Sequence, residues 1–299
     1  MTTPIRSFLF VPGDSEKKLS KVAESSADAL ILDLEDAVSE NRKAVARELT
    51  SHFIVEHRGR SRRSQLWVRI NPINTDHALV DLSAVVAAQP DGIMIPKING
   101  PLDVVRVHHY LEALETANGM TPGSVSVLPV ATETARAPFR LGDFADFGIA
   151  RLYGLTWGAE DLSAALGAST NLGQGGGWAV TYQLVRSLTL MGARAAEVEA
   201  VETLYVDIRD NDGLAESSRR ARAEGFSGRI AIHPGQVDTI NAAFTPSAEE
   251  VEFASRVVEA FSGDVGTVAL DGKMLDLPHL KQAQRVLALV AATDSPRSR

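Results

Sequence analysis

The chain has 299 residues, 44% of them hydrophobic and 23% charged, which is typical of a globular protein with a sizeable core. Its formal net charge of -8 argues against nucleic-acid binding and against adsorption to an anionic membrane, although a local basic cluster can still bind an anionic substrate. The sequence contains no cysteine, which excludes disulfides, thiolate metal sites and cysteine nucleophiles.

The first residues run directly into a strand-like segment without a secretory signal pattern, and no apolar stretch is long enough to span a bilayer. We therefore expect a cytoplasmic protein with no membrane and no nucleic-acid partner.

Short apolar runs alternate with longer helix-like segments along the whole chain. The expected strands are Ser7–Val11, Ala29–Leu34, Leu66–Ile70, Gly92–Pro96, Ser126–Val130, Arg151–Thr156, Leu204–Ile208 and Arg229–Ile232. The helix-like segments between them include Asp14–Ser25, Asn41–His57, Pro101–Asn118, Ala179–Ala196 and Asp212–Glu224. About eight such units close a (β/α)8 barrel.

We therefore predict an α/β fold, a TIM-like (β/α)8 barrel over residues 1–245 with a C-terminal helical lid extension over residues 246–299. In that extension we expect a helix, a short strand-like run at Val265–Leu270 and a last helix near Asp276–Ala291.

Period-two alternation in the second predicted strand separates two kinds of side chain. The three leucines of Ala29–Leu34 share one face and would pack under the helices, whereas Asp33 and Glu35 take the other face. Since catalytic groups collect at the carboxyl ends of barrel strands, we expect these two acids to face the barrel mouth.

Three basic residues at strand ends are substrate-binding candidates, together with the acid Glu133. Arg69 lies within an apolar strand, where it either forms a structural ion pair with a barrel carboxylate or clamps a substrate carboxylate or carbonyl. Lys97 ends the fourth strand, and the same two interpretations, a structural ion pair or a substrate contact, apply to it. His233 follows the eighth strand, and a single loop histidine is more often structural than catalytic.

Two carboxylates follow successive apolar runs. Glu133 comes after Ser126–Val130, and Asp161 comes after Arg151–Trp157. Alone, each has an ordinary explanation, a helix cap or first-turn acid for Glu133 and the opening of a short helix for Asp161. Together at one rim they predict a site for a hard cation, Mg2+ or alternatively Mn2+.

Several motifs in order resemble the HpcH/HpaI aldolase/citrate lyase family, in particular citrate lyase beta-subunit-like proteins, which include malyl-CoA and citramalyl-CoA lyases. The resemblance is carried by Arg6–Gly13, Leu32–Val38, Val68–Asn71, Ala131–Ala135, Gly158–Leu162, Tyr205–Asp210 and Ala231–Gln236.

The resemblance implies a TIM-like barrel with Mg2+ held by Glu133 and Asp161, with Arg69 touching substrate oxygens. It also implies that Glu35 and Asp36 hydrogen-bond the metal's waters. The segment Asp271–Pro278 resembles a lid whose acid, matched here by Asp276, reaches a neighbouring subunit's active site. A homo-oligomer, trimer or hexamer, is the corresponding expectation.

The expected activity is Mg2+-dependent cleavage of a 3-hydroxyacyl-CoA thioester of citramalyl, malyl or citryl type. The products would be acetyl-CoA and an α-keto acid resembling glyoxylate, pyruvate or oxaloacetate, and the carrier is CoA or an acyl carrier protein. Two alternatives stay open, namely a metal-dependent aldolase on free 4-hydroxy-2-oxo acids and a non-catalytic or regulatory lyase subunit.

Overall fold

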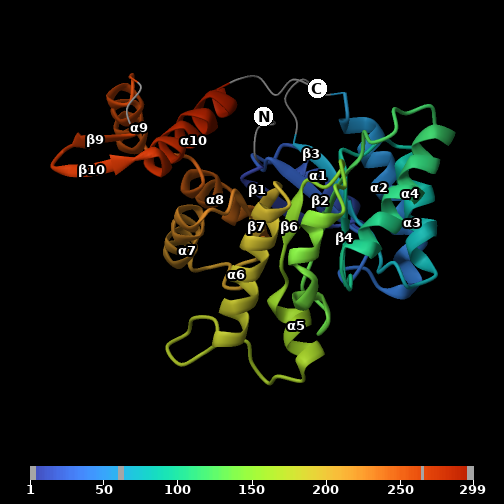
Figure 1. Ribbon diagram of the computed structural model, residues 1–299. Helices are drawn as coiled ribbons and strands as arrows, with labels where there is room; N and C mark the ends of the chain where they lie inside the picture. Colours follow the sequence, from blue (N-terminus) through green and yellow to red (C-terminus); the bar gives the residue numbers. More distant parts are fainter. Residues whose placement is uncertain (1–4, 60–63, 264–265, 295–299) are drawn as a thin grey trace.

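Parallel strands form a ring at the centre of the molecule (Figure 1). The computed structural model describes residues 5–59, 64–263 and 266–294. Within these residues the hydrogen-bonded strand order is β5-β4-β3-β2-β1-β8-β7-β6, and parallel bridges Val127–Leu152 and Val130–Thr156 close the ring. The predicted barrel is confirmed. Its strands are β1 (Ser7–Pro12), β2 (Ala29–Asp33), β3 (Gln65–Arg69), β4 (Gly92–Ile95), β5 (Ser126–Pro129), β6 (Gly154–Thr156), β7 (Glu199–Glu202) and β8 (Gly228–Ala231).

Helices surround the ring, as expected for strands that are apolar on both faces. They are α1 (Glu16–Val22), α2 (Lys43–His57), α3 (His77–Val86), α4 (Pro101–Ala117), α5 (Ala159–Leu166), α6 (Val180–Ala195), α7 (Asn211–Glu224) and α8 (Val237–Ala243). Short 3-10 turns lie at η1 (Glu40–Arg42), η2 (Ala137–Arg140), η3 (Gly142–Asp146) and η4 (Pro234–Gln236). No helix in the described part of the chain is both long and apolar enough to cross a membrane.

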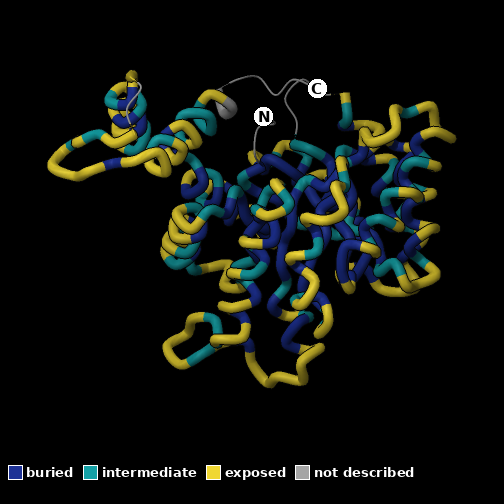
Figure 2. Tube along the Cα trace, viewed as in Figure 1, coloured by how far each residue is buried: buried dark blue, intermediate teal, exposed yellow. Residues whose placement is uncertain are grey.

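The alternation of side chains along each strand produces two hydrophobic cores. The larger core lies between the strands and the helices and takes the three leucines of Ala29–Leu34. The smaller core fills the barrel interior, where the rings of Phe8, Trp67 and Tyr153 meet edge to face at 5.5–5.9 Å. Figure 2 shows that the strands are buried almost throughout.

The seventh strand differs from the prediction. The expected strand at Leu204–Ile208 is wrong, because β7 is formed by Glu199–Glu202 and the later segment is a loop whose Val206 is 60% exposed. A glutamate can end this strand because Glu202, although buried, accepts hydrogen bonds from Trp157 Nε1 (2.7 Å) and Arg186 Nε (2.6 Å). A strand ending in glutamates lacks the apolar pattern that predicts one.

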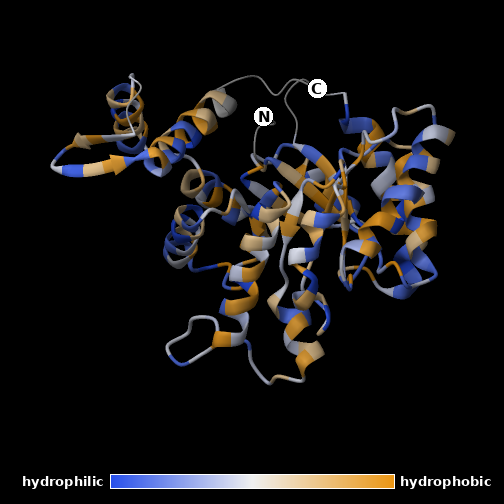
Figure 3. Cartoon of the chain, in the orientation of Figure 1, coloured by the Kyte–Doolittle hydropathy of each residue, from blue (hydrophilic) through white to orange (hydrophobic). Residues whose placement is uncertain are grey.

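The C-terminal segment forms a small unit beside the barrel, comprising α9 (Ala248–Ala260), β9 (Thr267–Leu270), β10 (Lys273–Asp276) and α10 (Leu277–Asp294). It contains a two-stranded hairpin besides helices, and it has its own apolar core around Val257, Phe261 and Leu275. Figure 3 shows hydrophobic residues in the helices and strands of this unit. Of the expected run Val265–Leu270, Val265 lies outside the described residues. Arg222 Nη2 of α7 donates to both carboxylate oxygens of Glu250 in α9 (2.6 and 2.7 Å), which ties this unit to the barrel.

Candidate active site

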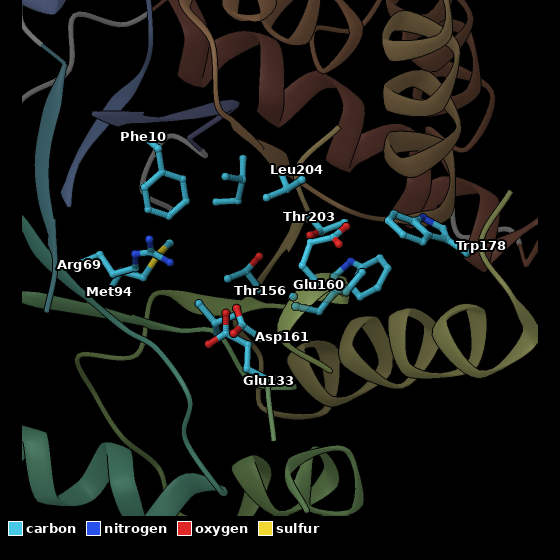
Figure 4. A pocket seen from close by; sticks show the side chains of 15 residues that line it. Phe10, Arg69, Met94, Glu133, Thr156, Glu160, Asp161, Trp178, Thr203 and Leu204 are labelled. Carbon is cyan, nitrogen blue, oxygen red and sulfur yellow. The ribbon is translucent and has the colours of Figure 1, made fainter. Parts of the chain in front are cut away.

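The two predicted metal ligands lie together at the rim. Glu133 follows β5, and Asp161 lies in the first turn of α5 directly after β6. The bridge between Val130 and Thr156 joins the carboxyl ends of these strands, so the two turns are neighbours. Both side chains line the same two cavities, and Figure 4 shows their carboxylates side by side. The geometry therefore permits one ion to be shared, while Asp161 also opens a short helix.

Glu133 is a buried acid with a hydrogen bond on one side and the backbone of Gly158 close to it on the other. Its side chain is 6% exposed, and its Oε2 accepts a hydrogen bond from the backbone N–H of Lys97 at 2.7 Å. Burial raises the pKa of Glu133 to about 8, and the nearby charge of Asp161 adds to the rise. On the other side, a Cβ placed on Gly158 would lie 2.9 Å from Glu133 Cγ and 3.0 Å from Oε1. Only glycine leaves room for this carboxylate.

Arg69 is held rigidly inside the barrel mouth. Its Nε and Nη2 each donate to a different oxygen of Asp33 at 2.7 Å, and Nη1 lies 2.9 Å from Glu35 Oε2. The guanidinium also stacks over the ring of Phe10 at 4.5 Å. Burial acts to lower the pKa of Arg69, but hydrogen bonds and charge from Asp33 outweigh it and raise the pKa. The structural ion pair is thus present, and the same side chain still lines a cavity.

Lys97 joins the acids of the second strand to the rim. Its backbone has φ of 51°, a left-handed conformation that is uncommon for a residue other than glycine. The ammonium contacts Glu35, donates to Asp36 at 2.8 and 3.0 Å, and lies 3.6 Å from Asp161 Oδ1. Lys97 therefore bridges three carboxylates and lines one of the cavities.

The environments of Glu35 and Asp36 separate their acidities. Burial raises the pKa of Glu35 even though Arg69 and Lys97 oppose the rise. Partial burial acts in the same direction on Asp36, but the hydrogen bond and charge of Lys97 outweigh it and lower the pKa of Asp36. Of the two, Glu35 is therefore the stronger base.

Two cavities meet at Glu133 and Asp161. The inner cavity, about 80 Å³, opens into the barrel mouth beside Arg69. The outer cavity, about 440 Å³, lies toward solvent beside Lys97. Most other side chains around the inner cavity are apolar, and they include Phe10, Met94, Val130, Trp178, Leu204 and Ile230. A small group fits the inner cavity, whereas a large ligand needs the outer one.

His233 lies apart from these cavities. It is exposed and begins a 3-10 turn, where its Nδ1 accepts the N–H of Gly235 at 3.1 Å in a capping box with Gln236. The structure gives this side chain a local capping role, and its assignment to substrate binding stays a prediction.

Asp276 ends β10 in the C-terminal unit and is exposed there. Its Oδ1 lies 2.5 Å from His279 Nδ1, and its backbone nitrogen lies 3.2 Å from the same atom. The acid is presented at the start of α10 on a unit that stands to one side of its own barrel (Figure 1). Its proposed role in a neighbouring subunit's site stays a prediction.

Sequence reasoning missed two aromatic residues of the site. Phe10 supports Arg69 from β1, and its alternation with the interior residue Phe8 could have revealed it. Trp178 closes the inner cavity and meets Trp157 edge to face at 5.2 Å. It arrives from the loop before α6, and no periodic signal marks it.

The chain matches two protein-family models. Residues 6–234 match the model of HpcH/HpaI aldolase/citrate lyase. The chain belongs to this family. Residues 184–292 also match a model described as a carbon–carbon bond lyase of the TIM-barrel fold. The protein is therefore an enzyme of a carbon–carbon lyase family, and the resemblance seen in its motifs is confirmed.

Relatives extend over nearly the whole chain. Mitochondrial citramalyl-CoA lyase from Rattus norvegicus is 31% identical over 97% of this chain and 87% of the relative. Citrate lyase subunit beta from Haemophilus influenzae is 32% identical over 94% of this chain and 95% of the relative. The crystal structure of protein CitE from Mycobacterium tuberculosis with magnesium, acetoacetate and coenzyme A has a TM-score of 0.79 and 31% identity, covering 97% of this chain and 100% of that one.

Proposed function

We propose that this enzyme cleaves the carbon–carbon bond of a 3-hydroxyacyl-CoA thioester that carries a carboxylate on its hydroxyl-bearing carbon. The products would be acetyl-CoA and an α-keto acid. The observation that carries the proposal is the convergence of Glu133, Asp161 and Arg69 around one cavity at the barrel mouth. Relatives named as CoA-ester lyases, and a related structure that contains magnesium and coenzyme A, support it.

The residues at the rim fit a hard divalent cation. Glu133 and Asp161 offer carboxylate oxygens, the ligands that Mg2+ prefers, and they are close enough for the charge of Asp161 to raise the pKa of Glu133. A cation between them would relieve that repulsion. Glu133 and Asp161 would hold Mg2+, which when bound supplies Lewis-acid polarisation of the substrate's hydroxyl and carboxylate oxygens. Glu35 and Asp36 would orient its water ligands.

Arg69 would bind the oxygen that changes from hydroxyl to carbonyl. Its guanidinium is already oriented by Asp33 and Phe10 when negative charge develops on that oxygen. The hydroxyl proton would pass to the Glu35–Asp36 pair, in which Glu35 is the stronger base because burial raises its pKa. Lys97 would hold both acids in place and contribute to substrate binding.

The bond that breaks joins the hydroxyl-bearing carbon to the carbon beside the thioester carbonyl. Its electron pair stays on the thioester fragment as an enolate, while the O–H electron pair forms the new keto group. The enolate carbon then takes a proton, which we assign to Asp276. One proton is gained by the base and one is lost by Asp276, so the reaction is balanced.

Asp276 would act on a neighbouring subunit of a homo-oligomer, a trimer or hexamer. The C-terminal unit projects beside its own barrel, and two apolar side chains next to Asp276 are exposed, Met274 by 78% and Leu277 by 51%. Such residues at the tip of a projecting unit suit contact with another copy. The thioester handle supplies binding energy remote from the reacting bond.

Product analysis tests the proposal. The full-length protein with Mg2+ is incubated with malyl-CoA, citramalyl-CoA or citryl-CoA, and in parallel with free 4-hydroxy-2-oxo acids. We expect acetyl-CoA and keto acid in equal amounts from a thioester and no cleavage of the free acids. Free CoA without keto acid would refute the lyase reaction, and cleavage of the free acids alone would favour the aldolase.

Asp161→Asn tests the metal site separately. The variant should lose turnover. Loss of a residue that only hydrogen-bonds a metal ligand lowers metal affinity by about 10–100-fold, and loss of the ligand Asp161 should weaken Mg2+ or Mn2+ binding by more than that. Asp146→Asn, at an exposed aspartate of η3, is the matched control and should leave both unchanged. Unchanged metal affinity in Asp161→Asn would contradict the site.

A further inference from the structure

The two cavities at Glu133 and Asp161 differ in size and in the chemistry of their walls, and this difference bears on which half of the substrate each one holds. The outer cavity is larger and faces solvent, whereas the inner cavity of about 80 Å³ is far below the volume that a drug-sized ligand needs. A coenzyme A arm therefore has to leave through the outer cavity. The keto-acid half of the substrate lies toward the inner cavity.

The wall of the inner cavity is apolar around most of its circumference. Phe10, Met94 and Ile230 come from β1, β4 and β8, and Leu204 and Trp178 complete the enclosure. Met94 is 1% exposed and Ile230 4%, and both belong to the apolar core of the barrel interior. The wall therefore offers mainly dispersion contacts to a substituent that enters it, with the hydroxyl groups of Thr156 and Thr203 as uncharged polar groups beside them.

The cationic side chain on the wall of the inner cavity, Arg69, already has acidic partners. Of the described residues that line it, only Arg69 is cationic, and Arg69 is engaged by Asp33 and Glu35. The other charged groups on the wall are the carboxylates of Glu133, Glu160 and Asp161. One carboxylate of a keto acid can share Arg69 and the cation site. A second carboxylate would be buried beside three acids without a cation of its own, which is strongly unfavourable.

We infer that the keto acid formed by this enzyme is a monocarboxylate with a short apolar side chain. The thioester cleaved would thus carry a methyl group on its hydroxyl-bearing carbon, as citramalyl-CoA does, in place of the hydrogen of malyl-CoA or the carboxymethyl group of citryl-CoA. This inference rests on the proposed lyase reaction and deepens it. A methyl group in an apolar pocket gives a preference of about 10–200-fold over hydrogen.

The three thioesters form a matched series, because they differ only in that one substituent. With full-length enzyme and Mg2+, kcat/KM should be highest for citramalyl-CoA, lower for malyl-CoA by about 10–200-fold, and lower for citryl-CoA by at least about 100-fold. As a second readout that needs no variant, pyruvate should inhibit thioester cleavage at lower concentration than oxaloacetate.

A variant that adds a cation to the wall tests the reason for the preference. Met94→Lys places an ammonium in the inner cavity on a side chain of similar length, and Met94→Gln is the neutral polar control. We expect Met94→Lys to raise the ratio of citryl-CoA to citramalyl-CoA kcat/KM by more than about tenfold, because a buried carboxylate gains a partner. Met94→Gln should leave the ratio within about threefold of the unaltered enzyme. Circular dichroism checks that both variants are folded.

The outcomes separate the two proposals. Equal or faster cleavage of citryl-CoA by the unaltered enzyme would overturn the inference while leaving the lyase reaction intact. Malyl-CoA cleaved as fast as citramalyl-CoA would overturn the methyl preference in the same way. If none of the three thioesters is cleaved, the proposed function itself fails, and the inference fails with it.

Discussion

Gly158 offers a direct test of the proposed cation site, because its lack of a side chain leaves room for Glu133. An added Cβ would lie 2.9 Å from Glu133 Cγ and 3.0 Å from Oε1, against the 3.4 Å at which ordinary contact begins. Glu133 would have to retreat by about 0.5 Å, the tolerance within which a catalytic group must be held. The backbone of Gly158 is extended, with φ of -122°, so alanine introduces no strain there.

We therefore expect Gly158→Ala to weaken Mg2+ binding by about 10–100-fold and to lower kcat/KM by a similar factor. The free energy of unfolding should fall by about 1–3 kcal/mol from overpacking. Isothermal titration calorimetry with Mg2+ and urea unfolding measure the two effects.

Gly142→Ala is the matched control, since a Cβ at that glycine meets no atom within 4 Å. It should change neither cation affinity nor activity. The reasoning is refuted if Gly158→Ala binds Mg2+ as tightly as the control, since the steric demand on Glu133 would then have no consequence for the site.

Three further predictions follow from the same geometry. Because burial raises the pKa of Glu133 to about 8, Mg2+ has to displace a proton below that pH, and the Mg2+ affinity should rise about tenfold between pH 7 and pH 9. Without Mg2+, the free energy of unfolding should fall as the pH rises from about 4.3 toward 8, because the carboxyl group binds its proton more tightly in the folded than in the unfolded protein. Asp33→Asn should lower the free energy of unfolding by about 3 kcal/mol in urea titrations and reduce kcat, because a buried guanidinium loses a charged partner. Asp276→Asn should lose activity without losing Mg2+ affinity, and mixing it with Asp161→Asn chains under conditions that exchange subunits should restore about one quarter of the sites.

Each of these measurements can contradict its premise. A flat dependence of Mg2+ affinity on pH between 7 and 9 would mean that Glu133 is ionised before the cation arrives. Full stability in Asp33→Asn would mean that Glu35 alone satisfies Arg69. No recovery on mixing the two inactive chains would place the action of Asp276 within its own subunit.

The parts of the site that follow from strand periodicity could be predicted from the sequence. Alternation along β2 placed Asp33 and Glu35 on the interior side, and strand ends placed Glu133 and Asp161 at one rim. These predictions rest on a period of two residues and on the parallel orientation of barrel strands, which the chain itself specifies.

Other features depend on contacts that no local pattern encodes. The buried position of Glu202 depends on Trp157 and Arg186, so β7 lacked an apolar signal. Lys97 combines a left-handed backbone with contacts to four acids, and its sequence context gives no hint of either. Trp178 reaches the inner cavity through the path of a loop, which periodicity does not describe.

The separate apolar core of the C-terminal unit has a consequence for how this enzyme can change over evolutionary time. The ring of strands closes without any contribution from that unit, which pairs β9 only with β10 and is tied to α7 through Arg222 and Glu250. Mutations that alter the reach or acidity of the projecting tip can therefore accumulate while the barrel keeps folding as before. Under the proposed mechanism, selection can change the proton donor Asp276 and the cation site of Glu133 and Asp161 as two independent traits.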